Sequence, residues 1–459
     1  MQKEMIKTIG EDYFAFKGIE GYYLFQTESF GIFKIDEKLY RKIDSLSESD
    51  AGGSEFPAEI VPLIEEMRLK APVTGEIHNK VRARLSEPDP ELTSINIFLT
   101  DRCNMRCRYC FTDDKPESLL ANRRTIDLDT AISAVDFYAE RMAGNDKPLS
   151  VNFFGGEPLL RYGDIKKIMQ HTTELAERDG KNTFFYMTTN ATLLDDEMID
   201  FFNSSNFEIV VSLDGDRTVH DANRIDADGR GTFDYVFQMS KRLFEQFGSR
   251  VRIRTTVSPD NPDVQKIASF FRSSELYRYG WEMMYESDRF PDKLWDEQSL
   301  AAFTESSGRY YAELYSLIKS GDIHPVELAQ LKIDLSRIKR KASKFTACQM
   351  GRESITIAPD GNFYSCHWLV GDESAVIGSP ETGFTAARAE SYPPAVFDNE
   401  DCRHCWARYL CGGGCPAVSR RTEARAVCID RKTRWQGLLS LYAQLLSDGH
   451  ELIEELVDV

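Results

Sequence analysis

Six strand-like segments alternate with helical ones between Ser94 and Tyr285, and this alternation is the feature that most constrains the fold. The helical segments carry apolar residues at three- and four-residue steps, as in Leu128, Ile132 and Val135. Repeated strand–helix units favour a parallel sheet with right-handed crossovers. The sequence therefore predicts an α/β fold, a partial (β/α)6 TIM barrel with an open side, whose strands are SINIFLT, LSVNFF, TFFYMTT, FEIVVSL, VRIRTTV and GWEMMY.

Three cysteines follow the first of these strands with the spacing C-x3-C-x2-C, at Cys103, Cys107 and Cys110. We expect them in the loop at the C-terminal end of that strand, where parallel α/β barrels carry their catalytic loops. Iron–sulfur clusters are normally held by four thiolates, so three leave one iron open, which indicates catalysis. A zinc site would need a fourth Cys or His nearby, and no histidine lies between Cys103 and Cys110.

The cysteine loop resembles the signature of the radical S-adenosylmethionine (SAM) superfamily, and three later segments agree with that family in order and spacing. They are FFGGEPLL at 153–160, TTNATLL at 188–194 and VVSLDG at 210–215. The resemblance implies that the open iron binds the amino and carboxylate groups of SAM. It also implies reductive cleavage of SAM to a 5′-deoxyadenosyl radical, which abstracts hydrogen from an unactivated C–H bond.

The same resemblance implies which residues hold SAM. Gly155 and Gly156 let the backbone approach the methionine part because no Cβ intervenes, and Glu157, before Pro158, can accept a bond from the amino group. Taken alone, GGEP favours a turn that opens a helix, and its place at the end of the second strand reverses that preference. Thr189, Asn190 and Ser212, at the ends of strands three and four, would bind the ribose, although capping or turn roles also fit them. Arg224 resembles the arginine near the SAM carboxylate, although a surface role also fits it.

Seven further cysteines occur only in the last quarter of the chain, at Cys348, Cys366, Cys402, Cys405, Cys411, Cys415 and Cys428. Their pattern resembles the SPASM extension, which in this family carries two auxiliary [4Fe-4S] clusters. Carried over by position, the outer cluster takes Cys402, Cys405, Cys411 and Cys428, and the inner cluster takes Cys348, Cys366 and Cys415. The alternative is a pair of zinc ribbons, because C-x2-C pairs are commonly zinc sites.

The number of cysteines leaves one auxiliary iron without a thiolate. Three [4Fe-4S] clusters with one iron open for SAM would take eleven cysteines, and the chain has ten. Water or a nearby carboxylate fills the vacant position, or it is kept for a substrate thiolate. A ferric iron would lower the pKa of such a thiol enough to deprotonate it.

The first 90 residues precede the barrel and are predicted to form a separate α+β domain. Residues 22–25 and 30–35 form a hairpin in this prediction, and helical patterns follow at 39–46 and 60–67. This arrangement resembles the winged-helix-like leader-recognition domain of ribosomal-peptide maturases, which captures an extended leader at a sheet edge. The alternative is a structural cap on the barrel.

The remaining boundaries follow from the motifs. We place the radical SAM barrel at 91–290, a helical bridge at 291–345, the SPASM domain at 346–430 and an amphipathic closing helix at 431–459.

Composition excludes several classes of protein. A net charge of −18 argues against a general nucleic-acid or anionic-membrane surface. No apolar run approaches the roughly 20 residues of a membrane helix, and the first residues lack a signal-peptide pattern. We therefore predict a cytoplasmic protein, in a compartment where thiols favour metal over disulfide.

The leading hypothesis is an enzyme that modifies a ribosomally made precursor peptide with a leader and a Cys-containing core. Hydrogen abstraction would be followed by closure of a Cys thioether, with flavodoxin or ferredoxin as electron donor. Alternatives are a carbon–carbon or carbon–oxygen crosslink, a sulfatase-type formylglycine maturase and a non-catalytic, metal-stabilised peptide-binding protein. Sulfatase-maturing relatives usually have Asp where this chain has His367. The catalytic base is unassigned, and Asp214 and His367 are the candidates. The competing interpretation of Asp214 is a turn residue at the end of its strand, and that of His367 is a packed, hydrogen-bonded neighbour of a metal ligand.

Overall fold

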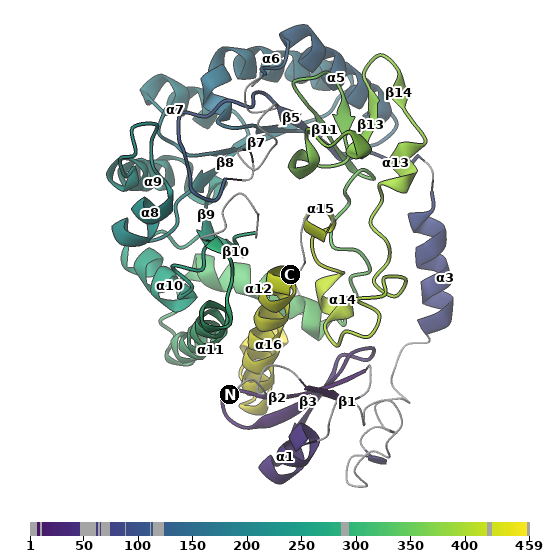
Figure 1. Cartoon of the computed structure of the whole chain (residues 1–459), viewed down its shortest axis with the longest axis vertical. Helices are drawn as coiled ribbons and strands as arrows, with labels where there is room; N and C mark the ends of the chain where they lie inside the picture. Colours follow the sequence, from purple (N-terminus) through teal and green to yellow (C-terminus); the bar gives the residue numbers. More distant parts are fainter. Residues whose placement is uncertain are drawn as a thin grey trace.

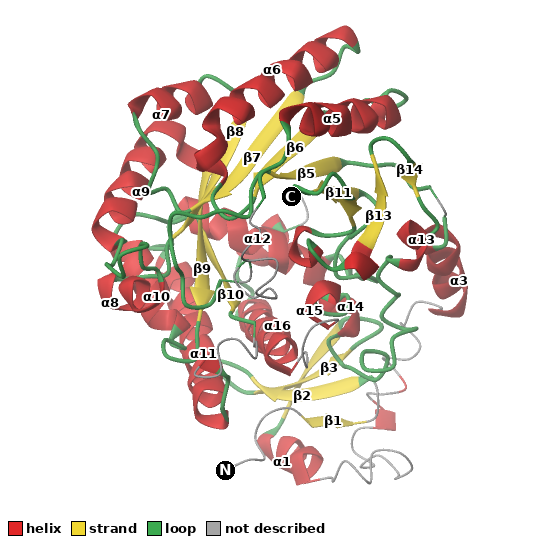
Figure 2. Ribbon diagram, turned by 45° about the horizontal axis from the view of Figure 1, so that its top comes forward, coloured by secondary structure: helices red, strands yellow, loops and turns green. Residues whose placement is uncertain are grey.

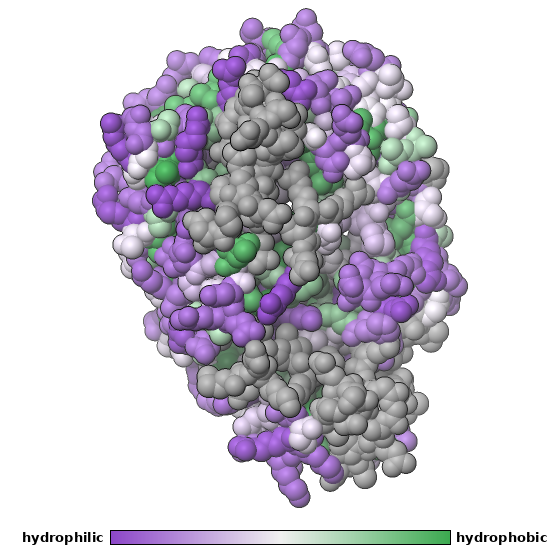
Figure 3. Space-filling view, viewed as in Figure 1, coloured by the Kyte–Doolittle hydropathy of each residue, from purple (hydrophilic) through white to green (hydrophobic). Residues whose placement is uncertain are grey.

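The computed structural model of the chain describes residues 7–9, 12–45, 61–62, 65, 74–87, 89–110, 112, 124–285, 293–419 and 425–456. A curved sheet with helices along its outer side forms the larger part of the molecule (Figure 1). On the face drawn in Figure 3, hydrophilic residues predominate around the rim, in keeping with the 28% of charged residues. Within the described part of the chain, none of the helices is both long enough and apolar enough to cross a bilayer.

All six predicted strands of the barrel are present and lie in parallel in the order of the sequence, which confirms the α/β fold. They are β5 (Ser94–Phe98), β6 (Leu149–Phe154), β7 (Thr183–Thr189), β8 (Phe207–Ser212), β9 (Val251–Val257) and β10 (Tyr279–Met283). The helices between them are α5 (Leu128–Met142), α6 (Tyr162–Arg178), α7 (Asp196–Asn203), α8 (Arg217–Asn223), α9 (Phe233–Phe247) and α10 (Val264–Ser273).

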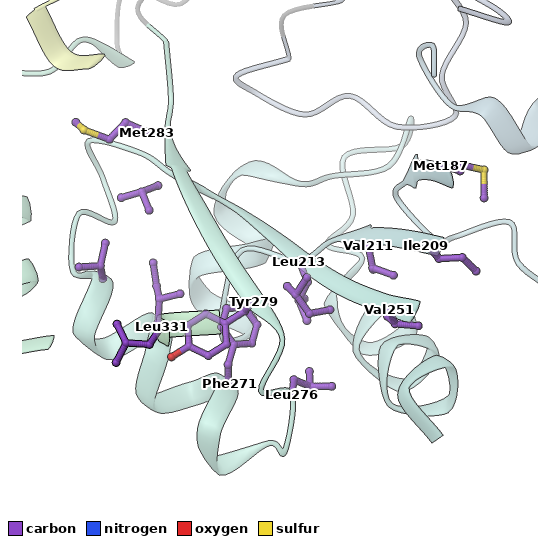
Figure 4. Packing of buried hydrophobic residues seen from close by; sticks show 14 of the residues in the cluster. Met187, Ile209, Val211, Leu213, Val251, Phe271, Leu276, Tyr279, Met283 and Leu331 are labelled. Atoms are coloured by element: carbon purple, nitrogen blue, oxygen red, sulfur yellow. The ribbon is translucent and has the colours of Figure 1, made fainter. Parts of the chain in front are cut away.

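Apolar side chains between the strands and the surrounding helices form the main core. Met187, Val211 and Val251 on three neighbouring strands are fully buried, and Phe271 of α10 packs nearby (Figure 4). Because parallel strands keep one direction, the loops after β5, β6, β7 and β8 all emerge at the same edge of the sheet. The fold thereby gathers the predicted motifs in one place.

The cysteine-rich region continues the barrel sheet, which the sequence did not predict. Strand β11 (Ser354–Ile357) pairs in parallel with β5, with Ile355 opposite Ile95. Antiparallel strands β12 (Phe363–Tyr364), β13 (Val376–Ser379) and β14 (Gly383–Phe384) complete a ten-stranded sheet. These strands have two to four residues each, too short for a periodic signal. Short helices α13 (Ala387–Glu390), α14 (Arg408–Cys411) and α15 (Pro416–Ser419) follow.

The closing helix differs from the prediction of an amphipathic helix. Helix α16 (Arg425–Ser447) begins before residue 431, and every residue from Leu438 to Leu445 is buried. The bridge helices α11 (Glu297–Ser320) and α12 (Pro325–Lys339) pack against it, as do β10 and β2. Elements on several sides of α16 thus bury its whole circumference. A short helix, α17 (Leu452–Glu455), follows the turn at Gly449.

The first strands form a separate four-stranded antiparallel sheet in the order β1 (Lys7–Ile9), β2 (Tyr13–Lys17), β3 (Tyr22–Gln26) and β4 (Gly31–Ile35). The predicted hairpin corresponds to β3 and β4, and α1 (Glu37–Ser45) covers one face of the sheet. The predicted helical pattern at Ile60, Leu63, Ile64 and Met67 lies outside the described residues. Helix α3 (Thr74–Leu85) then leads towards the barrel.

Candidate active site

An open cavity with an empty volume of about 1320 Å³ lies at the edge of the sheet where the loops after β5 to β8 emerge. The structure brings most of the predicted site residues together around it; they are Cys103, Cys107, Cys110, Gly155, Gly156, Glu157, Thr189, Asn190, Ser212 and Arg224. The sequence therefore located one continuous site from four separate motifs. Pro158 lies just behind it, as the first residue of a 3-10 turn.

Gly155 and Gly156 hold the loop after β6 directly against the cysteine loop. The amide of Gly156 donates to the carbonyl oxygen of Thr100 at 2.7 Å, and that of Glu157 donates to Arg102 at 2.9 Å. A Cβ on Gly156 would lie 2.2 Å from the carbonyl oxygen of Arg102. The expected reason for these glycines was close approach to SAM, and the structure adds a second reason, which is close approach of two backbones.

Glu157 links the same loop to the end of β7. Its Oε1 accepts bonds from the Thr189 hydroxyl at 2.7 Å and the Leu159 amide at 3.1 Å, and its Oε2 accepts one from the Asn190 amide at 2.9 Å. The side chain is 1% exposed, and this burial raises the pKa of the Glu157 carboxyl to about 7, although the three donors partly oppose the rise. Glu157 thus orients two of the predicted ribose-binding residues.

The raised pKa of Glu157 predicts a pH dependence of stability. The folded-state pKa of about 7 lies above the ordinary value of 4.5, so the folded protein binds the proton more tightly. The contribution of this group is therefore most favourable below pH 4.5, and about 3 kcal/mol is lost as the pH rises through 7. In urea unfolding of the metal-free protein between pH 5 and pH 8, Glu157→Gln should remove this slope. A slope identical to that of the parent would contradict the assignment.

Asn190 and Asn104 form a polar contact beside the first cysteine. The Asn190 side-chain amide donates to the Oδ1 of Asn104 at 3.0 Å and lies 3.8 Å from the Sγ of Cys103. The Asn104 amide in turn donates to the Thr192 hydroxyl at 2.8 Å. Bonds of this kind to a ligating sulfur orient the ligand and tune the metal. Asn104 and Thr192 were not predicted, although both lie inside the recognised motifs.

Asp214, Arg224 and Tyr109 form a buried polar group behind the cysteine loop. The Oδ2 of Asp214 lies 3.0 Å from the Nε of Arg224 and accepts the Tyr109 hydroxyl, while its Oδ1 accepts the Thr256 amide at 2.9 Å. Burial alone would lower the pKa of Arg224, but Asp214, Tyr109 and Cys107 raise it, so the guanidinium stays charged. Asp214 is 1% exposed and is engaged on both oxygens, so its visible role is to hold Arg224 towards the cavity.

The three predicted cluster ligands are half-buried and share one wall of the cavity. Burial raises the pKa of the Cys107 thiol, and the nearby charge of Arg224 lowers it. No three His, Cys, Asp or Glu side chains among the described residues converge as ligands of a single ion would. A four-iron cluster is bound differently, because each thiolate binds its own iron. Three adjacent thiols beside a buried cation are a donor set that fits such a cluster and its negative charge.

Electrostatic and packing contacts link later cysteines within each predicted group, and their assignment to two clusters stays a prediction. Burial, followed by the neighbouring thiols of Cys405, Cys428 and Cys411, raises the pKa of Cys402 to about 12, so these four lie close together. In the other group, burial raises the pKa of Cys348, and the nearby Cys415 raises it further. Cys366 and Cys415 pack against the same apolar cluster.

A glycine turn separates the two groups. Gly412, Gly413 and Gly414 have φ values of 79°, 99° and 61°, which other residues rarely adopt. This turn directs Cys411 and Cys415 to different groups, although they are four positions apart.

The far wall of the cavity reaches the inner cysteine group. It includes Tyr285, whose ring meets that of Trp368 edge-on at 4.6 Å between centroids, and the pair formed by Arg254 and Glu282. Trp368 lies two residues after Cys366 in the chain. None of these four wall residues was predicted; Arg254 and Glu282 lie on β9 and β10, which carry no recognisable motif. The cavity therefore extends from the Cys103 loop to residues that neighbour the inner cysteine group, although none of those three cysteines lines it.

His367 does not line this cavity. Its ring lies 4.3 Å from that of Phe154 at the end of β6, and loss of hydration, with a smaller effect of Arg254, lowers the pKa of His367 to about 3. The imidazole is therefore neutral at physiological pH. Its role as a catalytic base stays a prediction, as does that of Asp214.

The fold and site define the class of this protein. Residues 97–271 match the family model described as the radical SAM superfamily. The chain contains a radical SAM domain, as the cysteine loop indicated. The relatives of the chain include sulfatase-maturating enzymes and a cyclopropyl synthase.

The similarity to individual relatives is moderate. The radical SAM cyclopropyl synthase TigE of Paramaledivibacter caminithermalis is 23% identical over 301 residues, which cover 59% of this chain and 61% of TigE. A cysteine-type anaerobic sulfatase-maturating enzyme of Clostridium novyi is 27% identical over 39% of this chain and 47% of that enzyme. The chain thus spans about half to two thirds of the length of these two relatives.

A solved structure agrees with the fold. "Native anSMEcpe with bound AdoMet" superposes with a TM-score of 0.62 at 18% identity, covering 80% of this chain and 100% of that chain. This likeness supports the fold alone.

Proposed function

We propose that this protein is a radical SAM maturase that modifies a ribosomally made precursor peptide, by hydrogen abstraction followed by closure of a Cys thioether. The observation that carries the proposal is the cavity that runs from the Cys103 loop to Trp368, which lies two residues after Cys366. A substrate residue in that cavity would lie beside SAM on one side and an incompletely ligated auxiliary iron on the other.

The chain supplies the binding and orienting groups for this chemistry. When bound to Cys103, Cys107 and Cys110, a [4Fe-4S] cluster supplies the electron that cleaves SAM. Glu157 orients the ends of β7 for the ribose and is placed to receive the amino group of SAM, while Arg224 presents a fixed cation to the carboxylate.

The inner cysteine group supports thioether formation in particular. It contains three cysteines, Cys348, Cys366 and Cys415, so an auxiliary cluster there would keep one iron for a substrate thiolate. The electron released when that sulfur bonds to the carbon radical would pass to the same cluster, and an acidic carrier such as flavodoxin or ferredoxin would exchange electrons with the protein. Two hydrogens leave the peptide for each thioether formed.

A sulfatase-type formylglycine maturase is the second candidate. Several relatives have that activity, including an enzyme of Clostridium perfringens that is 23% identical over 68% of this chain and 85% of its own length. Against it, His367 occupies the position where those enzymes usually have Asp, and its lowered pKa leaves it without charge. Carbon–carbon and carbon–oxygen crosslinks share the same first step.

Anaerobic co-expression with a Cys-containing precursor peptide encoded nearby tests the proposal. Tandem mass spectrometry should show a product lighter by two hydrogens per link, with the linked cysteines resistant to alkylation. A product that is lighter but alkylates at every cysteine would replace the thioether by another crosslink. A formyl group in place of a Cys or Ser side chain would favour the second candidate, and absence of 5′-deoxyadenosine would leave a non-catalytic binding protein.

The N-terminal sheet is the proposed leader-binding domain. Its strand β4 lies at the edge of the sheet among the described strands, with β3 on its other side. A leader added along β4 would satisfy the backbone groups of that edge. We expect saturating leader peptide to slow hydrogen exchange at residues 31–35 and to leave the central strand β2 unchanged. Equal protection of both strands, or of neither, would favour a structural cap.

A further inference from the structure

The N-terminal sheet is packed directly onto the segment that carries three of the four outer cysteines, here called the outer cysteine segment (residues 402–411). Trp406 of this segment is 1% exposed. Its ring stacks on Phe14 of β2, with centroids 3.9 Å apart and planes at 6°, and Phe25 of β3 meets it edge-on. The Thr27 hydroxyl donates to the Trp406 carbonyl oxygen at 3.0 Å. Figures 1 and 2 both show these strands beside α14 and α16.

An ion pair between a buried arginine and two partly exposed carboxylates crosses the same contact. Arg408 is 5% exposed, and its Nη2 pairs with Asp12 and lies 3.6 Å from the Oε1 of Glu28. Asp12 precedes β2 and Glu28 follows β3, so both carboxylates belong to the N-terminal sheet. A buried guanidinium requires such partners, because removing them leaves an uncompensated charge away from water.

Arg408 also contacts the backbone that carries the cysteines. Its Nη1 donates to the carbonyl oxygen of Cys405 at 3.3 Å, and its own amide donates to the same oxygen at 3.1 Å. Helix α14 runs from Arg408 to Cys411, whose amide donates to Ala407 at 2.7 Å. Arg408 therefore stands at the point where the chain turns from one outer cysteine to the next.

We propose that Arg408, held by Asp12 and Glu28, is a positioning residue for the outer cysteine group, and that the N-terminal sheet is thereby part of that site. This inference rests on the proposed function in one respect, which is that the outer group holds an auxiliary cluster. It goes further by assigning a second role to a domain expected only to bind a leader. The sequence separates Asp12 from Arg408 by nearly four hundred residues, and the fold brings them together.

The test compares cluster retention in full-length variants after anaerobic reconstitution. Asp12→Asn combined with Glu28→Gln removes both carboxylates that face Arg408 across this contact. We expect a chelator to extract about four irons per chain at least about fivefold faster than from the parent. The electron paramagnetic resonance signal of the reduced outer cluster should change, while SAM cleavage without peptide stays within about twofold, because the SAM site is distant from this pair.

Matched variants distinguish positioning from general damage. Asp12→Glu keeps the negative charge and should retain iron like the parent. Arg41→Gln breaks an exposed ion pair within the same domain and should leave iron retention unchanged. If the double variant fails to fold, Thr27→Val, which removes one hydroxyl bond to Trp406, should still accelerate iron loss. Parental retention in the double variant or, if that variant does not fold, in Thr27→Val would overturn the inference.

Cys402→Ala with Cys405→Ala provides the reference for complete loss of the outer cluster. If this variant retains as much iron as the parent, the proposed auxiliary cluster is wrong. If it loses about four irons and the carboxylate variant loses them no faster than the parent, only the positioning role of Arg408 is wrong.

Discussion

We expect Cys107→Ala to abolish SAM cleavage, which is the largest effect that we expect from any single substitution. Production of 5′-deoxyadenosine with dithionite should fall at least about a thousandfold, because without the bound cluster the sulfonium has no electron source. Reconstituted iron should fall by about four per chain, from the SAM cluster alone. Liquid chromatography of the nucleoside and colorimetric iron analysis measure both quantities.

Cys428→Ala is the matched control for this experiment. It removes an exposed cysteine of the outer group and should spare SAM cleavage without peptide while lowering formation of the crosslinked product. If Cys107→Ala cleaved SAM as fast as the parent, a three-thiolate cluster in the β5 loop would be excluded. If Cys107→Ala and Cys428→Ala lost SAM cleavage to the same extent, SAM cleavage would depend on both cysteine regions.

Gly156→Ala should give the second-largest effect, although it adds a single methyl group. The new Cβ would lie 2.2 Å from the Arg102 carbonyl oxygen and 3.1 Å from the Cys103 amide nitrogen. Both are backbone atoms, so the cysteine loop itself must move. Overpacking of this kind costs about 1–3 kcal/mol. We expect SAM cleavage to fall at least about tenfold, with faster loss of the SAM cluster, measured by absorbance near 400 nm.

Gly163→Ala is the control for this substitution. Gly163 lies in α6, and a Cβ there would meet no heavy atom within 4 Å. It should leave activity unchanged and raise the melting temperature slightly, because alanine favours the helix. If Gly156→Ala held its iron and cleaved SAM like Gly163→Ala, the contact between the two loops would not position the cysteines.

The gathering of the SAM motifs could be predicted because each lies at the end of a strand with a clear pattern. The structural role of each individual residue could not be predicted from the sequence. Gly156 was expected to face a ligand, whereas its tightest contact is with Arg102. Asp214 was considered as a base, which stays a prediction, and its contacts with Arg224, Tyr109 and the backbone of Thr256 were not foreseen. Such roles depend on which loop lies opposite, and strand periodicity carries no information on that.

The sequence by itself determined the six parallel strands, the two cysteine regions and the superfamily, because strand periods and ligand spacings are local properties of a few neighbouring residues. Only the tertiary structure decided that β11 extends the barrel sheet, that α16 is buried on all sides and that Asp12 and Glu28 reach Arg408. These contacts join residues hundreds of positions apart. Their formation depends on the summed burial of the whole core, which no local pattern records.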